Sequence, residues 1–310
     1  MRRKPTLAQS SVSNPGARGR RRTSLAHVPG TTTLWQHTST QPTMFTSSDT
    51  FIPGIGTLWL PMKQLSAMSV VGQAVSHWTL DATEEDFPKA PVFDAVTGFG
   101  GNGYYVDSSN DTSVRLHIPG KTGGGCVTDG PFRNYTVNMG PNNSTAYNPR
   151  CLKRDFSPSF ASQKLNMTMV DKVLAGKTFQ EFDVAVQGWV SIDGLTYHGG
   201  GHLGVGGDLG DIGDLYNSPS DPLFFLHHAN MDRVWATWES QDIKRRVKDI
   251  SGPDTQFAYP FDFYGDVAYQ NITLDYQMHF GALTNSSWVR VGDVMDVQGG
   301  VLCYAYDELY

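Results

Sequence analysis

Acidic residues are absent from the first 48 positions, which hold seven basic residues instead. Residues 49–310 therefore carry a net charge of −13, because the whole chain carries −6. A nucleic-acid-binding protein would show a basic face, so this acidic body argues against nucleic acid as a partner. The basic start is rich in Ser, Pro and Gly, and we predict that 1–50 is disordered or belongs to no family domain.

Long apolar runs are also lacking, and none approaches the roughly 18 residues that a membrane span requires, so we expect no membrane partner. The first 30 residues have no apolar core, so they do not form a secretory signal peptide as written. Sequons for N-glycosylation are numerous nevertheless, and together they favour a glycoprotein that follows a secretory route. They begin at Asn110, Asn134, Asn142, Asn143, Asn166, Asn271 and Asn285.

Cysteine is scarce and odd in number. Cys126 and Cys151 would close a loop of plausible size, which leaves Cys303 unpaired. Two interpretations stay open at this point. All three cysteines are buried thiols, or the partner of Cys303 is missing from this chain.

Charged residues make up 17% of the chain, below the roughly 25% of an average soluble domain. Residues 77–160 are rich in Gly, Pro and Asn, which predicts long loops there. Helices are predicted over 162–175 and 178–190, and a third begins at Asp221-Pro222, a good N-cap followed by a residue suited to the first helical position. The segments 288–291 and 301–304 are β-like.

Four of the nine histidines form a cluster in the sequence. His198 and His202 are four residues apart, so on a helix both imidazoles would reach one metal ion. Three consecutive glycines separate them, at a cost of roughly 1 kcal/mol each relative to Ala. The segment is therefore a loop with solvated histidines, or it excludes bulk because something approaches closely. His227 and His228 are adjacent in the predicted third helix, and neutral imidazoles suit Cu, Zn, Fe or Ni.

The run Ser-Pro-Ser-Asp-Pro-Leu-Phe-Phe-Leu-His-His-Ala-Asn-Met-Asp-Arg-Val-Trp over 218–235 resembles the second copper-binding motif of tyrosinases and catechol oxidases. The His198–His202 pair lies upstream at the separation that this family uses. Further segments resemble the short fungal-type branch of the family or its closing tyrosine motif: 78–103, 123–132, 148–155 and Tyr304-Ala305-Tyr306. The resemblance implies a mainly α fold, a partial four-helix bundle with long loops and small β elements.

The resemblance also implies which residues form the site. His198, His202 and His228 would bind the second copper, and His227 would be a neighbour of that site rather than a ligand. Asp232 would orient a metal-bound imidazole, or it makes a hydrogen bond or salt bridge within its helix. The candidates for the substrate pocket are Gly199, at a position thought to influence the choice between monophenol and diphenol, and Phe224 and Phe225, which are otherwise core.

The first copper site of the family is not recognisable. A type-3 copper enzyme needs six histidines around two coppers, and upstream of Trp78 the chain offers only His27, His37 and His77, none in the expected context. We therefore divide the chain into 1–50, a divergent remnant of the first-site region over 51–76, and a copper-binding domain over 77–310. We expect a truncated or misassembled N-terminus, and no C-terminal lid domain after Tyr310.

Three functions remain. The first is a secreted, copper-dependent polyphenol oxidase that converts small phenols or o-diphenols to o-quinones with O2, inactive in this chain if the first site is absent. The second is a non-catalytic glycoprotein of the same family that binds one metal. The third, dioxygen carriage as in haemocyanins, is disfavoured by the same missing half-site.

Overall fold

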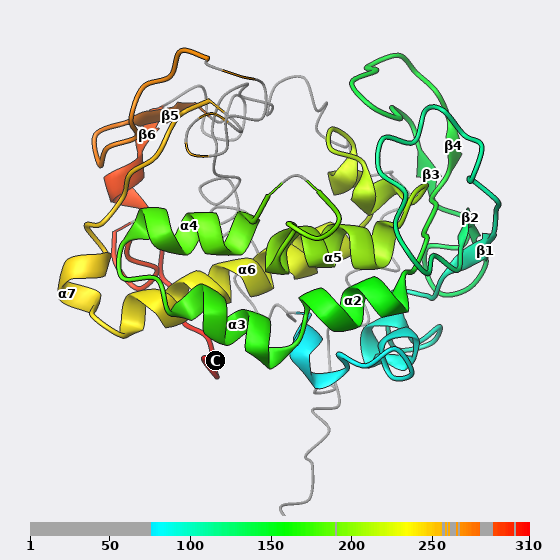
Figure 1. Cartoon of the computed structure of the whole chain (residues 1–310), viewed down its shortest axis with the longest axis horizontal. Helices are drawn as coiled ribbons and strands as arrows, with labels where there is room; N and C mark the ends of the chain where they lie inside the picture. The colour runs from blue at the N-terminus through cyan, green and yellow to red at the C-terminus, as the bar shows by residue number, and fades with distance from the viewer. Residues whose placement is uncertain are drawn as a thin grey trace, which may run out of the picture. The chain divides into compact units, whose positions relative to one another are not determined.

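The computed structural model describes residues 76–189, 191–255, 258, 260, 265, 267–279, 288–300 and 302–310. Within these residues the chain is mainly helical with small strands, which confirms the predicted fold class (Figure 1). The predicted segments 1–50 and 51–76 lie outside the described residues, apart from Ser76. In the described part, no helix is long and apolar enough to cross a membrane.

The α-helices in the described part of the chain differ greatly in length, and the longest of these, α6, is almost wholly buried. They are α2 (Pro158–Lys164), α3 (Met167–Leu174), α4 (Phe179–Gln187), α5 (Tyr197–Gly206), α6 (Leu223–Ser240) and α7 (Ile243–Arg246). The 3-10 helices are η2 (Trp78–Leu80), η3 (Phe87–Lys89), η4 (Pro91–Phe93), η5 (Asp211–Gly213), η6 (Ser218–Ser220) and η8 (Val291–Asp293). In Figure 1, α5 and α6 lie in the middle, and α2, α3 and α4 run beside them.

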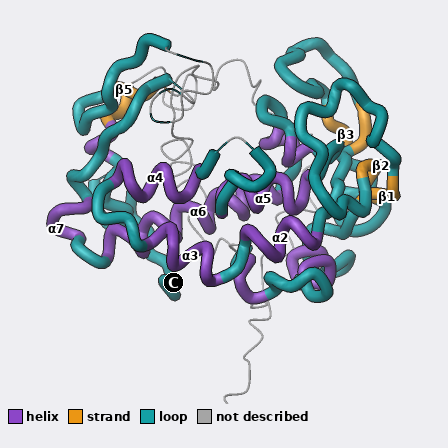
Figure 2. Tube along the Cα trace, in the orientation of Figure 1, coloured by secondary structure: helices purple, strands orange, loops and turns teal. Residues whose placement is uncertain are grey.

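Among the described residues, strands form three two-stranded antiparallel sheets beside the helices, and Figure 2 shows the strands as short pieces among loops. They pair β1 (Gly103–Tyr105) with β2 (Gly124–Val127), β3 (Thr136–Val137) with β4 (Arg150–Cys151), and β5 (Gln277–His279) with β6 (Trp288–Arg290). The predicted strand over 288–291 is thus confirmed, whereas 302–304 forms no strand. The long loops predicted for 77–160 are confirmed as well.

A disulfide joins Cys126 of β2 to Cys151 of β4 and ties the first two sheets together. Cys303 is free and exposed, so the interpretation of three buried thiols is wrong. Closing a loop of this length stabilises a fold by about 3 kcal/mol, chiefly by restricting the unfolded chain. The loop region is thereby held on the helices with very little regular structure of its own.

The helix predicted over 162–175 is wrong in its bounds, because it is two helices that meet at Leu165 and Asn166. The Asn166 side chain accepts a hydrogen bond from the amide of Met169 and so begins α3 as its N-cap. The composition of 162–175 suits a helix throughout, so the sequence did not reveal this break. The next predicted helix, over 178–190, ends earlier than expected, at Gly188, whose φ of 68° favours glycine.

The glycine-rich segment is helix α5, and close packing explains its glycines. A Cβ on Gly200 would lie 2.6 Å from Cβ of Lys164, and one on Gly204 would lie 3.0 Å from Cβ of Ala161. Both neighbours belong to α2, so the two helix backbones approach closely only because these side chains are missing. Of the two interpretations that the sequence left open, the structure therefore selects close approach.

Helix α6 begins at Leu223, one residue later than predicted. The carboxylate of Asp221 accepts the amide hydrogen of Leu223 and forms a fully buried salt bridge with Arg154 at 2.8 Å. The far half of α6 packs through aromatic rings, since the Trp238 ring lies 5.1 Å from that of Phe182 and the Trp235 ring lies 5.3 Å from that of Phe179. These contacts fix α6 against α4.

Candidate metal centre

Three imidazoles from α5 and α6 converge at one point. His202 Nε2 lies 3.2 Å from His198 Nε2 and 3.0 Å from His228 Nε2. The spacing of four residues places His198 and His202 on one face of α5, and α6 brings His228 to them. The structure therefore brings together the three histidines that the sequence analysis selected.

The ring nitrogens that face away from this point are held by acceptors. His198 Nδ1 lies 2.7 Å from Gln187 Oε1, and His202 Nδ1 lies 2.7 Å from the carbonyl oxygen of Ile212. Because both partners accept, each Nδ1 carries the hydrogen and donates it, and each Nε2 keeps its lone pair. Metal-binding histidines are usually oriented in this way by a partner on the other nitrogen.

The electrostatic setting keeps these rings neutral. Burial lowers the pKa of His198 and of His228 well below the ordinary value, and it lowers the pKa of His202 to about 4. Two neutral lone pairs 3.2 Å apart repel each other unless a cation lies between them. Two imidazole nitrogens bound tetrahedrally to one metal ion would lie about 3.3 Å apart. The donor set therefore fits a metal ion.

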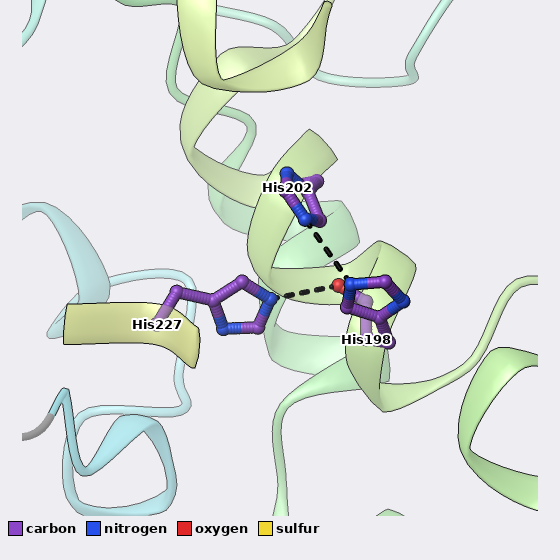
Figure 3. A group of neighbouring side chains, drawn as sticks. All are labelled: His198, His202 and His227. Carbon is purple, nitrogen blue, oxygen red and sulfur yellow. Dashed lines mark hydrogen bonds between the residues drawn. The ribbon is translucent and has the colours of Figure 1, made fainter. Parts of the chain in front are cut away.

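His227 lies in the same cluster, and its ring nitrogen is within 4.8 Å of those of His198 and His202. Figure 3 shows its ring pointing from α6 toward α5, with a dashed line to the backbone oxygen of His198. Its Nδ1 accepts a hydrogen bond from Trp78 Nε1 at 3.1 Å, and its Nε2 donates to that oxygen at 3.0 Å. Distance alone would allow His227 as a ligand, but its hydrogen bonds engage both nitrogens.

The candidates for the substrate pocket lie beside the cluster. The ring of Phe224 is 4.0 Å from that of His228, centroid to centroid, and Phe225 meets Phe224 edge-on at 5.4 Å. Phe224 is 5% exposed, so it covers one face of His228 and also belongs to the core. Gly199 is partly exposed, and a Cβ there would meet the side chain of Leu195.

Asp232, one turn beyond His228, contacts the C-terminal tail. Its Oδ2 accepts hydrogen bonds from the hydroxyls of Tyr304 at 2.6 Å and Tyr306 at 2.5 Å. Burial and the Asp232 carboxylate raise the pKa of Tyr304, so this phenol stays protonated and keeps donating. The tyrosine motif thus docks on α6 through Asp232, and a role of Asp232 in orienting an imidazole stays a prediction.

The contacts that two further residues make at the site carried no signal in the sequence. Gln187 lies in the last turn of α4, where helical periodicity does not mark it, and it contacts His198 only because α4 packs on α5. Trp78 begins a segment that resembles the family, but this resemblance does not predict what the indole contacts. Its indole reaches His227 across 149 positions, a contact that no local pattern predicts.

The other histidines whose side chains the structure describes have different partners. His77 Nε2 lies 2.7 Å from a guanidinium nitrogen of Arg233, and burial, with this cation, lowers the pKa of His77 to about 4. His117 pairs with Asp208 at 2.9 Å on the loops near β2. Over the described ranges, the cluster on α5 and α6 is therefore the one group of histidines that offers a metal site.

Comparison with known proteins identifies the architecture. A model of the common central domain of tyrosinase matches residues 65–241. The chain belongs to the tyrosinase family. Membership in this family implies copper as the metal, and the histidine cluster is compatible with one copper site. The family prediction is thereby confirmed.

Several fungal members of the tyrosinase family resemble the chain. The N-acetyl-6-hydroxytryptophan oxidase ivoB of Emericella nidulans is 32% identical over 264 residues, which are 74% of this chain and 67% of that protein. Tyrosinase P of Aspergillus terreus is 29% identical, over 70% of this chain and 63% of its own length. A solved polyphenol oxidase variant from Thermothelomyces thermophila superposes with a TM-score of 0.67 at 30% identity, covering 83% of this chain and 74% of that one.

Proposed function

We propose that this protein is a copper-dependent oxidase of small phenols or o-diphenols, which it converts to o-quinones with O2. The observation that carries the proposal is the convergence of two imidazole Nε2 atoms on that of His202, from His198 at 3.2 Å and from His228 at 3.0 Å. Family membership supports copper as the metal and phenols as the substrate class. Imidazole donors suit copper chemically.

The proposed ligands are His198, His202 and His228. His227 is excluded from the set because its Nδ1 lone pair accepts the indole hydrogen of Trp78, and its Nε2 hydrogen is donated to a backbone oxygen. When bound, copper supplies the redox chemistry with O2. The protein residues hold neutral nitrogens in place, with Gln187 and Ile212 fixing two of the rings. Phe224 shields one face of His228 from water.

The candidate residues for the substrate pocket stay Gly199, which carries no side chain beside His198, and Phe224 and Phe225, which offer apolar rings. An aromatic wall suits a planar phenol, because aromatic rings pack favourably edge-to-face or offset. Secretion and N-glycosylation stay predictions of the sequence. Asn166 is a poor acceptor for a glycan, because its amide caps α3 and donates to the carbonyls of Ser162 and Gln163.

A second candidate function is a family member that binds one metal without oxidising phenols. It is favoured by the position of His77, which pairs with Arg233 rather than joining a second group of ligands. His27 and His37 lie outside the described residues, as does the side chain of His279. A dinuclear oxidase would need three ligands beyond the described cluster.

Copper stoichiometry and activity separate these functions. The full chain is loaded with copper, its metal content is measured by mass spectrometry, and catechol oxidation is followed by absorbance and O2 uptake. Two coppers per chain with turnover support the oxidase, one copper without turnover supports the second candidate, and a chain that binds none contradicts both.

Two alanine variants test the ligand assignment within the same assay. At saturating copper, His228→Ala is expected to lose the metal of this site, whereas His227→Ala keeps most of it. Removing a ligand nitrogen leaves two donors, which lowers affinity by more than the roughly 10–100-fold expected for a residue that only supports a ligand. The reverse pattern would show that His227 is the ligand.

A further inference from the structure

His227 is fully buried between two polar partners whose roles are fixed by chemistry. An indole N–H can only donate, so Trp78 Nε1 donates to His227 Nδ1 at 3.1 Å. A backbone carbonyl can only accept, so His227 Nε2 carries the other hydrogen and donates it to the oxygen of His198 at 3.0 Å. The tautomer of His227 is therefore locked from both sides.

The carbonyl that His227 contacts belongs to His198, in the first turn of α5. In a helix, the oxygen of residue 198 accepts from the amide of residue 202, and a carbonyl oxygen has a second lone pair. His227 engages that oxygen as an additional donor. It is thus attached to the turn of α5 that joins the two histidines His198 and His202.

The space for this contact is also built into the sequence. A Cβ on Gly201 would lie 2.2 Å from Cε1 of His227, so only glycine lets the ring reach the backbone of α5. The ring of His227 also stacks on that of His198, with centroids 5.7 Å apart and planes 21° apart. Trp78 is held in turn by the aromatic rings of Phe87 and Phe93.

We propose that Trp78 and His227 form a positioning pair that fixes the first turn of α5, and with it the spacing of the imidazoles of His198 and His202. The proposal rests on the proposed function only in taking these two histidines as metal ligands. His227 acts through the backbone and touches no substrate. Trp78 acts through His227 by fixing which nitrogen is free to donate.

The experiment measures two properties of the full chain. Nitrogen-15 NMR of the metal-free protein reports the tautomer of His227, and competition of a chelator for Cu(II) gives the copper dissociation constant. The variants are His227→Phe, which removes both hydrogen bonds, His227→Gln, which keeps a donor for the His198 oxygen, and Trp78→Phe, which removes the indole donor. Trp238→Phe is the matched control, because it removes another buried indole hydrogen bond, to the oxygen of Gly176.

We expect His227→Phe to raise the copper dissociation constant by roughly 10–100-fold while the stoichiometry at saturation is unchanged. His227→Gln stays within about threefold of the starting protein, and Trp78→Phe mixes the His227 tautomers and weakens copper binding to an intermediate degree. Combining Trp78→Phe with His227→Phe adds nothing to His227→Phe alone, because both act through one contact. Trp238→Phe changes neither property.

Each contrary result has a distinct meaning. Unaltered copper affinity in His227→Phe and Trp78→Phe overturns the positioning pair and leaves the proposed function intact. Loss of the copper itself in His227→Phe, with copper retained in His228→Ala, makes His227 a ligand and overturns the pair together with the ligand assignment. A starting protein that binds no copper overturns the proposed function and the pair. If His227→Phe does not fold, His227→Gln and Trp78→Phe still decide the question.

Discussion

At the scale of single residues, the acceptor that holds Nδ1 decides how firmly the rings of His198 and His202 are oriented with Nε2 toward the cluster. His202 is held by a backbone oxygen, which no substitution removes, whereas His198 is held by the side chain of Gln187. Gln187 is in turn positioned by Asp183, whose Oδ1 accepts from its amide at 3.4 Å. Of these two imidazoles, His198 is therefore the one whose support can be removed by mutation.

Gln187→Leu should raise the copper dissociation constant by roughly 10–100-fold, since outer partners of metal-bound histidines contribute about that much. Without an acceptor at Nδ1, the ring of His198 is free to rotate or to place its hydrogen on Nε2, which blocks the metal. Copper titration against a competing chelator provides the measurement.

Gln187→Glu should retain binding, because a carboxylate also accepts the hydrogen of His198 Nδ1. Gln163→Leu on α2 is the matched control, since Gln163 donates to the oxygen of Ser159 and has no contact with the site. Equal affinity in Gln187→Leu and Gln163→Leu would mean that the hydrogen bond to His198 does not orient the ring.

At the scale of elements, α5 shows packing overriding intrinsic helix propensity. Alanine is about 1 kcal/mol better than glycine inside a helix, so Gly→Ala changes in α5 would stabilise it if propensity alone mattered. Gly201 faces the ring of His227, whose two hydrogen bonds prevent it from moving aside. A Cβ on Gly199 would meet Leu195, with Cδ2 at 2.6 Å and the stiffer Cβ and Cγ atoms at 3.3 Å.

Gly201→Ala should therefore lower the free energy of unfolding by about 1–3 kcal/mol, the usual cost of an overpacked buried position. Gly199→Ala, in the same helix, should cost less than Gly201→Ala, because the nearest atom, Cδ2 of Leu195, can rotate away and the other contacts are at 3.3 Å, while alanine adds up to about 1 kcal/mol of helix propensity. Urea unfolding of the two variants under the same conditions gives the comparison. A Gly201→Ala protein as stable as Gly199→Ala would refute the close contact.

Helix α5 and its neighbours show which features of the site the sequence could predict and which it could not. The spacing of His198 and His202 and the long motif around His228 pointed to the histidines that cluster in the structure, because such signals are local in the chain. The helical state of the glycine run depends on α2, and the break before α3 depends on a single cap at Asn166, so neither could be derived from composition. Contacts such as that of Trp78 with His227 form only when distant elements pack.

At the scale of the whole described molecule, α6 gathers segments from far apart in the sequence. Ser76 donates its amide to the oxygen of Leu226, and Trp78 reaches the next residue of α6. From the C-terminal side, the hydroxyl of Tyr310 bonds Asn230, and its ring lies 4.0 Å from the guanidinium of Arg233. The histidine cluster is therefore supported by contacts that span nearly all of the described chain.

Because those contacts bury several histidines in the folded protein, their rings stay neutral, and the free energy of unfolding depends on pH. In the metal-free protein His77 and His202 have pKa values lowered to about 4, chiefly by burial, from the ordinary histidine value of 6.5. Between these values the unfolded chain binds more protons than the folded chain, so the free energy of unfolding rises with pH. This stability is complete above about pH 6.5 and is lost as the pH falls toward about 4.

The loss should amount to a few kcal/mol for His202, because each unit of pKa difference corresponds to about 1.4 kcal/mol. Urea unfolding of chelator-treated protein at a series of pH values between about 7 and 4 measures it. Copper adds stability at neutral pH, and this gain shrinks on acidification because protons compete for the ligand nitrogens. His77→Gln should make the profile of the metal-free protein shallower, since one group that titrates only on unfolding is removed. A flat profile over this range, or stability that increases on acidification, would contradict the neutral state of the buried histidines.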